Sequence, residues 1–393
     1  MTSSPSSSAP GAGGNASAPA QASAPAGAPT TAPAGAASTA PAGAIGSAPG
    51  GASSGAAGSG DLVDTLLRLP PLTATPAAER PRQARVLVRR LIENIERVLL
   101  GKTGAVRQVV SALLAHGHIL IQDVPGVGKT TLARALARSI QTHFQRIQFT
   151  PDLLPGDLIG VSVYNQASHQ FEFHPGPIFS GILLADEINR TLPRTQSALL
   201  EAMAEYTVTT DGQTRRLPEP FMVLATQNPI EFGGTYPLPE AQLDRFLLRI
   251  DIGYPDRAHE KLLLEQGRTG AEPDRLQPVM TVDDVRELQR LTRTIRCDEA
   301  LLDYILDLVE KTRKHKKLLL GASPRAALML QAAARAHALV ADRAFVIPED
   351  IRAMIRPVLI HRLVARGMGA GSIGDDPIDD ILNDILNSVP VPQ

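Results

Sequence analysis

The chain has 393 residues, a length that allows on the order of two or three domains, and its 39 lysines and arginines nearly balance 40 aspartates and glutamates. A net charge of -1 gives no broad basic surface for nucleic acid, and the single Cys297 excludes an internal disulfide and agrees with a reducing cytoplasm. The nine histidines lack zinc-ligand spacing and no apolar run approaches the roughly 20 residues that span a bilayer, so neither a transition-metal site nor membrane insertion is expected.

The first sixty residues differ in composition from the rest of the chain. Residues 1–60 contain no Lys, Arg, Asp or Glu and consist almost wholly of Ala, Pro, Ser, Gly and Thr. Such a segment cannot bury enough apolar surface to offset the entropy lost on folding, so we expect a disordered tail. It has neither the basic start nor the apolar core of a secretory signal, so export is not expected. Residues 61–81 are interrupted by prolines and are predicted to be a linker with at most one short helix.

Two helices and a strand lead to the most informative motif. Apolar positions at helical spacing predict helices over residues 82–100 and 106–114, and the apolar run at 118–122 predicts a buried strand. A glycine-rich stretch follows this strand, and residues 132–137 leave it at helical spacing. The stretch consists of Asp123, Val124, Pro125, Gly126, Val127, Gly128, Lys129, Thr130 and Thr131.

Strand, glycine-rich loop and helix in this order are typical of a phosphate-binding loop. Gly126 and Gly128 let backbone N–H groups close around phosphate oxygens at a helix N-terminus. Lys129 can reach the β- and γ-phosphates, and Thr130 can be a ligand of Mg²⁺. Asp123 stands where the general G-x-x-x-x-G-K-[ST] pattern has its first glycine, which is the one departure from that pattern. A chance glycine-rich turn is the alternative, and the flanking strand and helix argue against it.

Three more segments are predicted to be strands, and the last two of them are fully apolar. They cover residues 144–149, 182–185 and 221–225, and helical segments separate them. Strands that are covered on both faces read as continuous apolar runs, so the pattern favours an α/β fold with a doubly wound, mostly parallel sheet.

Polar residues directly follow two of these strands. Asp186 and Glu187 end one of them, and one carboxylate there can hold Mg²⁺ through water while the other polarises the attacking water. Acids at the start of a surface helix are the alternative interpretation. Asn228 ends the next strand and could hydrogen-bond the γ-phosphate or the water, although an Asn at such a place is, taken alone, more often a turn residue.

The remaining segments are two hairpins and a run of helices. Alternating residues predict β-hairpins over 161–173 and 206–217. A basic run at 311–317 fits a solvated helix end better than a nucleic-acid site, and we expect the final helix to dock on its neighbours rather than on a partner. The predicted helices, which would form an all-α lid, are 256–266, 282–295 behind the cap Thr281, 299–314, 324–340, 348–363 and 378–386.

Six ordered strings resemble the MoxR family of AAA+ ATPases, in the helix-2-insert clade. The resemblance extends from about Gly101 to the C-terminus, and an Asp at the first loop position is usual in that family. The strings are Thr150–Asp157, His174–Phe179, Leu183–Arg190, Gln196–Glu205, Leu224–Pro229 and Pro237–Phe246.

The resemblance implies an AAA+ ATPase core over residues 82–254, a helical lid with a C-terminal helix over 255–393, and ATP and Mg²⁺ as cofactors. It implies that Lys129 and Thr130 serve Walker A, that Asp186 and Glu187 serve Walker B, and that Asn228 is sensor 1. Arg245 resembles the arginine finger, which acts on the ATP of a neighbouring subunit, and Arg325 resembles sensor 2. A structural salt bridge is the alternative for each arginine. The two hairpins lie near the pore in relatives, with ordinary surface hairpins as the alternative.

The expected activity is therefore Mg²⁺-dependent ATP hydrolysis by a cytoplasmic ring, a hexamer, that remodels or matures a client. The resemblance implies a von Willebrand factor A domain protein as that client. One alternative is a nucleic-acid motor of the same clade, which the near-neutral charge disfavours. The other is a nucleotide-gated scaffold, which would have no need of the water-activating residues Asp186, Glu187, Asn228 and Arg245.

Overall fold

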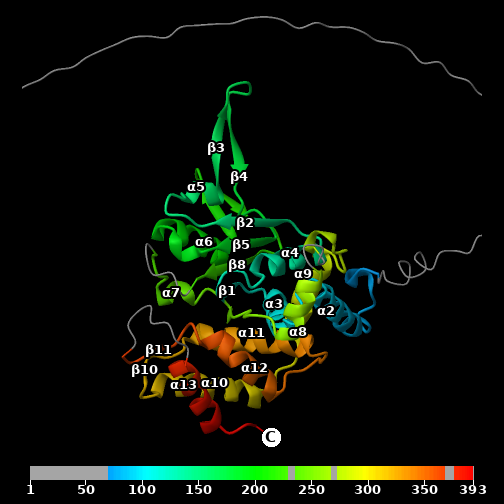
Figure 1. Cartoon of the computed structure of the whole chain (residues 1–393), viewed down its shortest axis with the longest axis vertical. Coiled ribbons are helices and arrows are strands. Elements are labelled where there is room, and N and C mark those ends of the chain that lie inside the picture. The colour runs from blue at the N-terminus through cyan, green and yellow to red at the C-terminus, as the bar shows by residue number, and fades with distance from the viewer. Residues whose placement is uncertain (1–69, 229–234, 267–271, 368–375, 393) are drawn as a thin grey trace, which may run out of the picture. The chain divides into compact units, whose positions relative to one another are not determined.

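A five-stranded parallel sheet organises the computed structural model (Figure 1), which describes residues 70–228, 235–266, 272–367 and 376–392. The predicted tail, most of the linker and its short helix lie outside these residues. Every neighbouring pair in the sheet is parallel, so all five strands end at the same edge. In spatial order the strands are β2 (Phe144–Gln148), β5 (Ile182–Asp186), β8 (Met222–Gln227), β1 (Ile119–Gln122) and β9 (Leu248–Ile250).

The prediction of an α/β fold with a parallel sheet is confirmed, and four of the five strands were predicted. The fifth strand, β9, was missed because it has only three residues, with Arg249 in the middle. It pairs with β1 and places Leu248 opposite Ile119. It is the outermost strand of the sheet, next to β1, and the predicted arginine finger Arg245 lies just before it in the chain.

Both faces of the sheet are buried, because successive side chains of a strand point to opposite faces. Ile119 and Ile121 of β1 join one apolar cluster, whereas Leu120 joins the other. The first cluster is covered by α2 (Arg80–Glu96), α3 (Thr103–Leu114) and α4 (Lys129–Ser139). The second cluster is covered mainly by α6 (Pro193–Glu205), with the short α5 (Pro155–Ile159) beside it.

Both predicted hairpins are present. One consists of β3 (Gly160–Asn165) and β4 (Gln170–Pro175), and it projects away from the sheet in Figure 1. The other consists of β6 (Thr207–Thr210) and β7 (Gln213–Arg216). The hairpins touch, since the hydroxyl of Ser162 donates to Asp211 and the Arg215 guanidinium lies 3.9 Å from the Phe173 ring centre.

Helices follow the sheet, and the predicted helical lid is confirmed. Thr281 caps α9 as predicted, accepting from the N–H of Asp284 while the Asp284 carboxylate accepts from the N–H of Thr281. The helix predicted over 348–363 ends at Leu359, four residues earlier than predicted. Val364 and Ala365 form a short strand that pairs with Leu318–Leu320, and neither strand was predicted. The elements are α8 (Arg257–Gln266), α9 (Val282–Thr294), α10 (Glu299–Lys314), β10 (Leu318–Leu320), α11 (Pro324–Val340), α12 (Pro348–Leu359), β11 (Val364–Ala365) and α13 (Asp376–Ser388).

The final helix, α13, packs on α10 and α12 through buried Ile381, Leu382 and Ile385, as expected. The division of the chain after residue 254 stays a prediction, because the apolar cluster under the sheet continues into α11 and α12. The smaller elements are the single turns η1 (Leu72–Ala74), η2 (Ile188–Arg190) and η4 (Pro273–Arg275), together with α7 (Glu240–Leu243). Within the described part of the chain, no helix has the length and apolar character needed to cross a membrane.

His118, at the start of β1, is a buried polar residue that links three elements. Its Nδ1 accepts from the backbone N–H of Val223 at 3.0 Å, so the proton is on Nε2, which donates to the carbonyl of Met203 at 3.0 Å. Burial is the main cause that lowers the pKa of His118 to about 4. The folded chain therefore holds this imidazole neutral, and protonation would point a new N–H at the N–H of Val223.

This pKa predicts an acid-sensitive contribution to stability. Because the folded pKa lies below the unfolded value, the contribution of His118 is complete above about pH 6.5 and is lost as the pH falls toward 4. We expect the wild-type free energy of unfolding to fall by about 1.4 kcal/mol through this residue between about pH 7.5 and about pH 5.5. Urea unfolding should show a shallower pH slope for His118→Asn, which has no titrating group. Identical slopes for the two proteins would contradict the prediction.

Candidate functional site

The predicted phosphate loop lies at the edge where the strands end. It follows β1 directly, and α4 begins at Lys129 with Gly128 as its N-cap. Gly126 and Gly128 have φ values of +88° and +98°, a region that side chains with a Cβ rarely adopt. The two glycines therefore allow the backbone to turn its N–H groups toward an anion at the start of α4, where the helix dipole favours negative charge.

The ammonium of Lys129 lies inside this loop. Its Nζ donates to the carbonyl of Asp123 at 2.6 Å. Burial lowers the pKa of Lys129, and the opposing causes are the carboxylates of Asp123, Asp186 and Glu187, which favour the charged form. The charges of the two predicted Walker B acids therefore act on the pKa of Lys129.

Asp123 differs from the other loop residues in what its side chain does. Its Oδ1 accepts from the N–H of Val124 at 2.8 Å, and its Oδ2 accepts from the N–H groups of Ile252 and Gly253 at 2.7 and 2.6 Å. The carboxylate is buried and fully engaged with backbone. We predicted Asp123 among the nucleotide-binding residues, whereas these contacts give its side chain another task, which is to tie the loop to the segment after β9.

Asp186 and Glu187 are held by a third residue at the end of β8. The hydroxyl of Thr226 donates to Asp186 Oδ1 at 2.6 Å and accepts from the N–H of Glu187 at 2.9 Å. Glu187 has a φ of +58°, which is costly for a residue with a Cβ and turns its side chain out of the line of the strand. Sequence analysis missed Thr226. Its only signal was a hydroxyl in an otherwise apolar strand, two residues before Asn228.

Charged and amide groups complete the surroundings of the two acids. Arg146 on β2 donates to Asp186 Oδ2, with its Nη2 at 2.5 Å. Glu187 Oε2 accepts from Arg190 at 3.0 Å and also from the amide of Gln148. These contacts fix both carboxylates at the edge where the phosphate loop lies. Sequence analysis gave no role to these three residues: Arg190 ends one of the six strings but was assigned no function, and Arg146 and Gln148 belong to no local pattern.

The same edge carries the other predicted residues of this site. Thr130 is the second residue of α4, and Asn228 follows β8 next to β1, with Gln227 opposite Gln122. A hydroxyl and a carboxylate at this edge, Thr130 and Asp186, are hard oxygen donors of the kind that Mg²⁺ prefers. Thr130 lies in the first turn of α4, which begins directly after the phosphate loop, and Asp186 is the last residue of β5 at the same edge. The residues therefore fit Mg²⁺ together with a nucleotide phosphate.

Arg245 lies at the opposite edge of the sheet. It precedes β9, which runs parallel to β1, and the N–H of Leu247 donates to the carbonyl of His118 at 2.8 Å. The phosphate loop follows β1, whereas Arg245 lies where β1 begins, so the length of a four-residue strand, about 13 Å, separates the two edges. Arg245 donates to the carbonyl of Leu200 on α6 and is half-buried.

Arg325 lies on the side of Arg245. It is the second residue of α11 and is exposed, and the α11 cap Ser323 contacts the Asp244 carboxylate at 3.4 Å. Its charge is also one of the lesser causes, after burial, that lower the pKa of His118 at the start of β1. The structure thus brings Lys129, Asp186 and Glu187 together at one edge and places Arg245 and Arg325 at the other.

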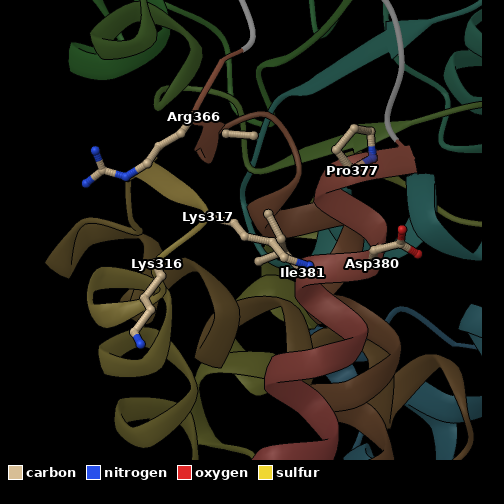
Figure 2. A pocket seen from close by; sticks show the side chains of 7 residues that line it. Lys316, Lys317, Arg366, Pro377, Asp380 and Ile381 are labelled. Atoms are coloured by element: carbon tan, nitrogen blue, oxygen red, sulfur yellow. The ribbon is translucent and has the colours of Figure 1, made fainter.

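A separate cavity of about 530 Å³ lies in the lid beside α13. In Figure 2 the side chains of Arg366 and Asp380 point in opposite directions, and Lys316 points away from both. The charged groups do not converge on one point, so we assign the cavity no role in nucleotide binding. Its lining residues are Lys316, Lys317, Ala365, Arg366, Pro377, Asp380 and Ile381.

Comparisons with known proteins identify the family and both of its domains. The family model described as ATPase family associated with various cellular activities (AAA) matches residues 118–248, and an AAA lid domain matches residues 310–385. The chain is 51% identical over 278 residues to the uncharacterized protein YeaC of Bacillus subtilis, which covers 71% of this chain and 87% of YeaC. It is 42% identical over 309 residues to Chaperone MoxR1 of Mycobacterium tuberculosis, which covers 74% of this chain and 81% of MoxR1.

A solved structure is also similar. The crystal structure of an inferred ATPase from Cytophaga hutchinsonii has a TM-score of 0.73 and 36% sequence identity. The similarity covers 81% of this chain and 98% of that one. The likeness therefore includes both the sheet with its phosphate loop and the helices that follow it.

The contacts of Asp123 predict that a glycine, the residue of the general pattern, is harmful at this position. Asp123→Gly removes the acceptor of three N–H groups, and we expect the free energy of unfolding to fall by about 2–4 kcal/mol. Urea unfolding measures this, and titration with a fluorescent ATP analogue should show a smaller loss of affinity than Lys129→Ala causes. Asp123→Asn, which keeps one acceptor oxygen, should be intermediate. Wild-type stability of Asp123→Gly would contradict the role we give to the carboxylate.

Proposed function

Because the chain belongs to the MoxR family of AAA ATPases, we propose that it hydrolyses Mg·ATP in a ring of identical subunits and uses the energy to remodel a client protein. The observation that carries the proposal is the separation of the catalytic groups. The phosphate loop and the paired acids lie at one edge of the sheet, and the two candidate phosphate-sensing cations lie at the other.

At the first edge each residue has a defined task. The loop N–H groups and Lys129 hold the β- and γ-phosphates, and Thr130 and Asp186 would hold Mg²⁺. The metal supplies positive charge that offsets the charge developing on the phosphate oxygens. Glu187, oriented by its turn and by Arg190, is placed to accept a proton from the attacking water. Asn228 would orient that water or the γ-phosphate.

The second edge completes the site of another subunit. Arg245 and Arg325 cannot reach the phosphates on the far edge of their own sheet, because a strand length lies between. If one copy presents this edge to the phosphate loop of the next, each interface contains one full set of groups. Such head-to-tail contacts between identical chains form a ring when the rotation from one subunit to the next closes on itself. The family resemblance favours six subunits.

The client and the cellular task depend on relatives. MoxR1, which is 42% identical, is named a chaperone, and this favours a chaperone-like task here. A von Willebrand factor A domain protein is the client that the family resemblance implies. A cytoplasmic location stays a prediction. Hydrolysis that DNA stimulates in a salt-sensitive way would instead favour the nucleic-acid motor.

The task of Glu187 predicts a separation of binding from turnover. Glu187→Gln should bind ATP with wild-type affinity yet lose turnover by about 10²–10⁴-fold, the usual contribution of a positioned base. Lys129→Ala should weaken binding itself. Phosphate release and nucleotide titration measure the two effects. The same change at exposed Glu260, on α8, is the control and should leave both unchanged. Near-normal turnover of Glu187→Gln would exclude Glu187 as the base. A variant that binds ATP without turnover is also suited to capturing a client.

The two-edge arrangement predicts complementation between inactive variants. Arg245→Ala and Glu187→Gln should each be nearly inactive alone, since a trans arginine contributes about 10³–10⁵-fold to turnover. Mixed rings should recover hydrolysis, because some interfaces join an intact acid from the Arg245→Ala chain to an intact arginine from the Glu187→Gln chain.

Phosphate release across a series of mixing ratios measures the recovery, with subunit exchange checked by pull-down of differently tagged chains. If chains mix and no ratio restores activity, dilution of each variant into wild type separates the explanations. A linear loss would mean that Arg245 acts within its own chain. A steep loss would mean that the ring needs every site intact.

A further inference from the structure

Arg362, just after α12, is a buried cation at the edge that carries Arg245 and Arg325. Its side chain is 2% exposed, and its Nε donates to Asp244 Oδ1 at 2.7 Å. Burial lowers the pKa of Arg362 to about 10, with Asp244 acting against that shift, so the guanidinium stays charged near neutral pH. Asp244 is the residue directly before Arg245.

The guanidinium also holds the backbone on both sides of Arg245. Its Nη2 donates to the carbonyls of Asp244, at 3.3 Å, and Phe246, and its Nη1 donates to the carbonyl of Leu247 at 3.3 Å. Arg362 thus binds the Asp244 carboxylate and three backbone carbonyls, and these groups lie on both sides of Arg245 in the chain. The conformation of the turn that presents Arg245 depends on these contacts.

The same cluster reaches the start of α11, where Arg325 lies. Arg362 Nη2 contacts Met329 Sδ at 2.7 Å, one helical turn after Arg325. Asp244 contacts the cap of α11, Ser323, on the other side of Arg325. Asp244 and Arg362 therefore join the turn that carries one cation to the helix that carries the other.

We propose that the ion pair between Asp244 and buried Arg362 is a positioning device that fixes Arg245 and Arg325 relative to each other, so that both meet the phosphates of a neighbouring subunit. The proposal rests on the trans role given to these arginines above. It extends that role to two residues that act through the backbone around Arg245 and the start of α11.

The chemistry of the pair favours positioning over simple stabilisation. Burial removes the hydration of the Arg362 guanidinium, and this cost offsets much of the stability that its ion pair with Asp244 could add. The planar fork of arginine, in contrast, constrains the direction of every partner it binds. Geometry of this kind matters for catalysis, since a displacement of about 1 Å can reduce turnover by about 100-fold.

The test uses Asp244→Asn and Arg362→Lys in the full-length chain, measured by steady-state ATP hydrolysis, nucleotide titration and thermal unfolding. Both variants should retain wild-type KM and ATP affinity, because their own phosphate loop is at the other edge. We expect kcat to fall by about 10–100-fold. Mixing either variant with Glu187→Gln should restore hydrolysis, since the Glu187→Gln chain supplies correctly placed arginines to the intact acids of the variant.

A matched control distinguishes positioning from loss of stability. Asp350 is a fully buried acid of the same lid that pairs with Arg343 and His337. Within the described part of the chain, its hydrogen-bond partners do not include residues 244–247. Asp350→Asn should lower the melting temperature and leave kcat unchanged well below that temperature. Arg245→Ala, measured in parallel, tests the premise.

The outcomes separate the two levels of the argument. Full turnover of Arg245→Ala would overturn the trans role and the positioning role with it. An inactive Arg245→Ala beside Asp244→Asn and Arg362→Lys with kcat within about 3-fold of wild type would overturn the positioning role alone. The positioning role would also be overturned if Asp350→Asn, at equal stability, lost as much kcat as Asp244→Asn and Arg362→Lys. The same holds if the chains mix and no mixture with Glu187→Gln restores the kcat of these two variants.

Discussion

Parallel pairing of β1 with β8 and β9 is the constraint on which the rest of this structure depends. Because parallel strands all end at one edge, the residues that follow β1, β5 and β8 are brought together without any special packing. The phosphate loop, the paired acids and Asn228 are those residues. The same pairing sends whatever precedes β9 to the other edge, and that is where Arg245 lies. A subunit built in this way carries its candidate catalytic groups on two surfaces.

The site also depends on backbone conformations that the surroundings must support. Glu187 has a positive φ, which costs on the order of 1 kcal/mol or more for a residue with a Cβ. Thr226 supports this turn through one hydroxyl that bonds both Asp186 and the N–H of Glu187. Asp123 supports the phosphate loop in a similar way through three backbone N–H groups. In each case a short polar side chain at a strand end fixes a turn that carries candidate site residues.

The sequence predicts those parts of the molecule whose signal is local. The sheet strands at 182–185 and 221–225, both hairpins and the lid helices follow from apolar runs and periodicity, and the structure contains all of them. The contacts that position the site are different, because they join residues far apart in the chain: Asp123 meets Gly253, and Asp244 meets Arg362. The sequence around each of these residues contains no pattern that indicates its distant partner. The prediction missed strand β9 because three residues are too few to show an alternating pattern.

These long-range contacts meet on β9, which gives the strand a significance beyond its length. At one end its continuation, Ile252–Gly253, donates to Asp123 beside the phosphate loop. At the other end the residues before it, Phe246 and Leu247, accept from Arg362 of the lid. Both ends are held by buried charged groups and the strand between them pairs with β1, so it is a rigid element and not a flexible connection. The candidate phosphate loop and the turn that carries Arg245 are therefore attached to the two ends of one strand, about 10 Å of hydrogen-bonded backbone apart.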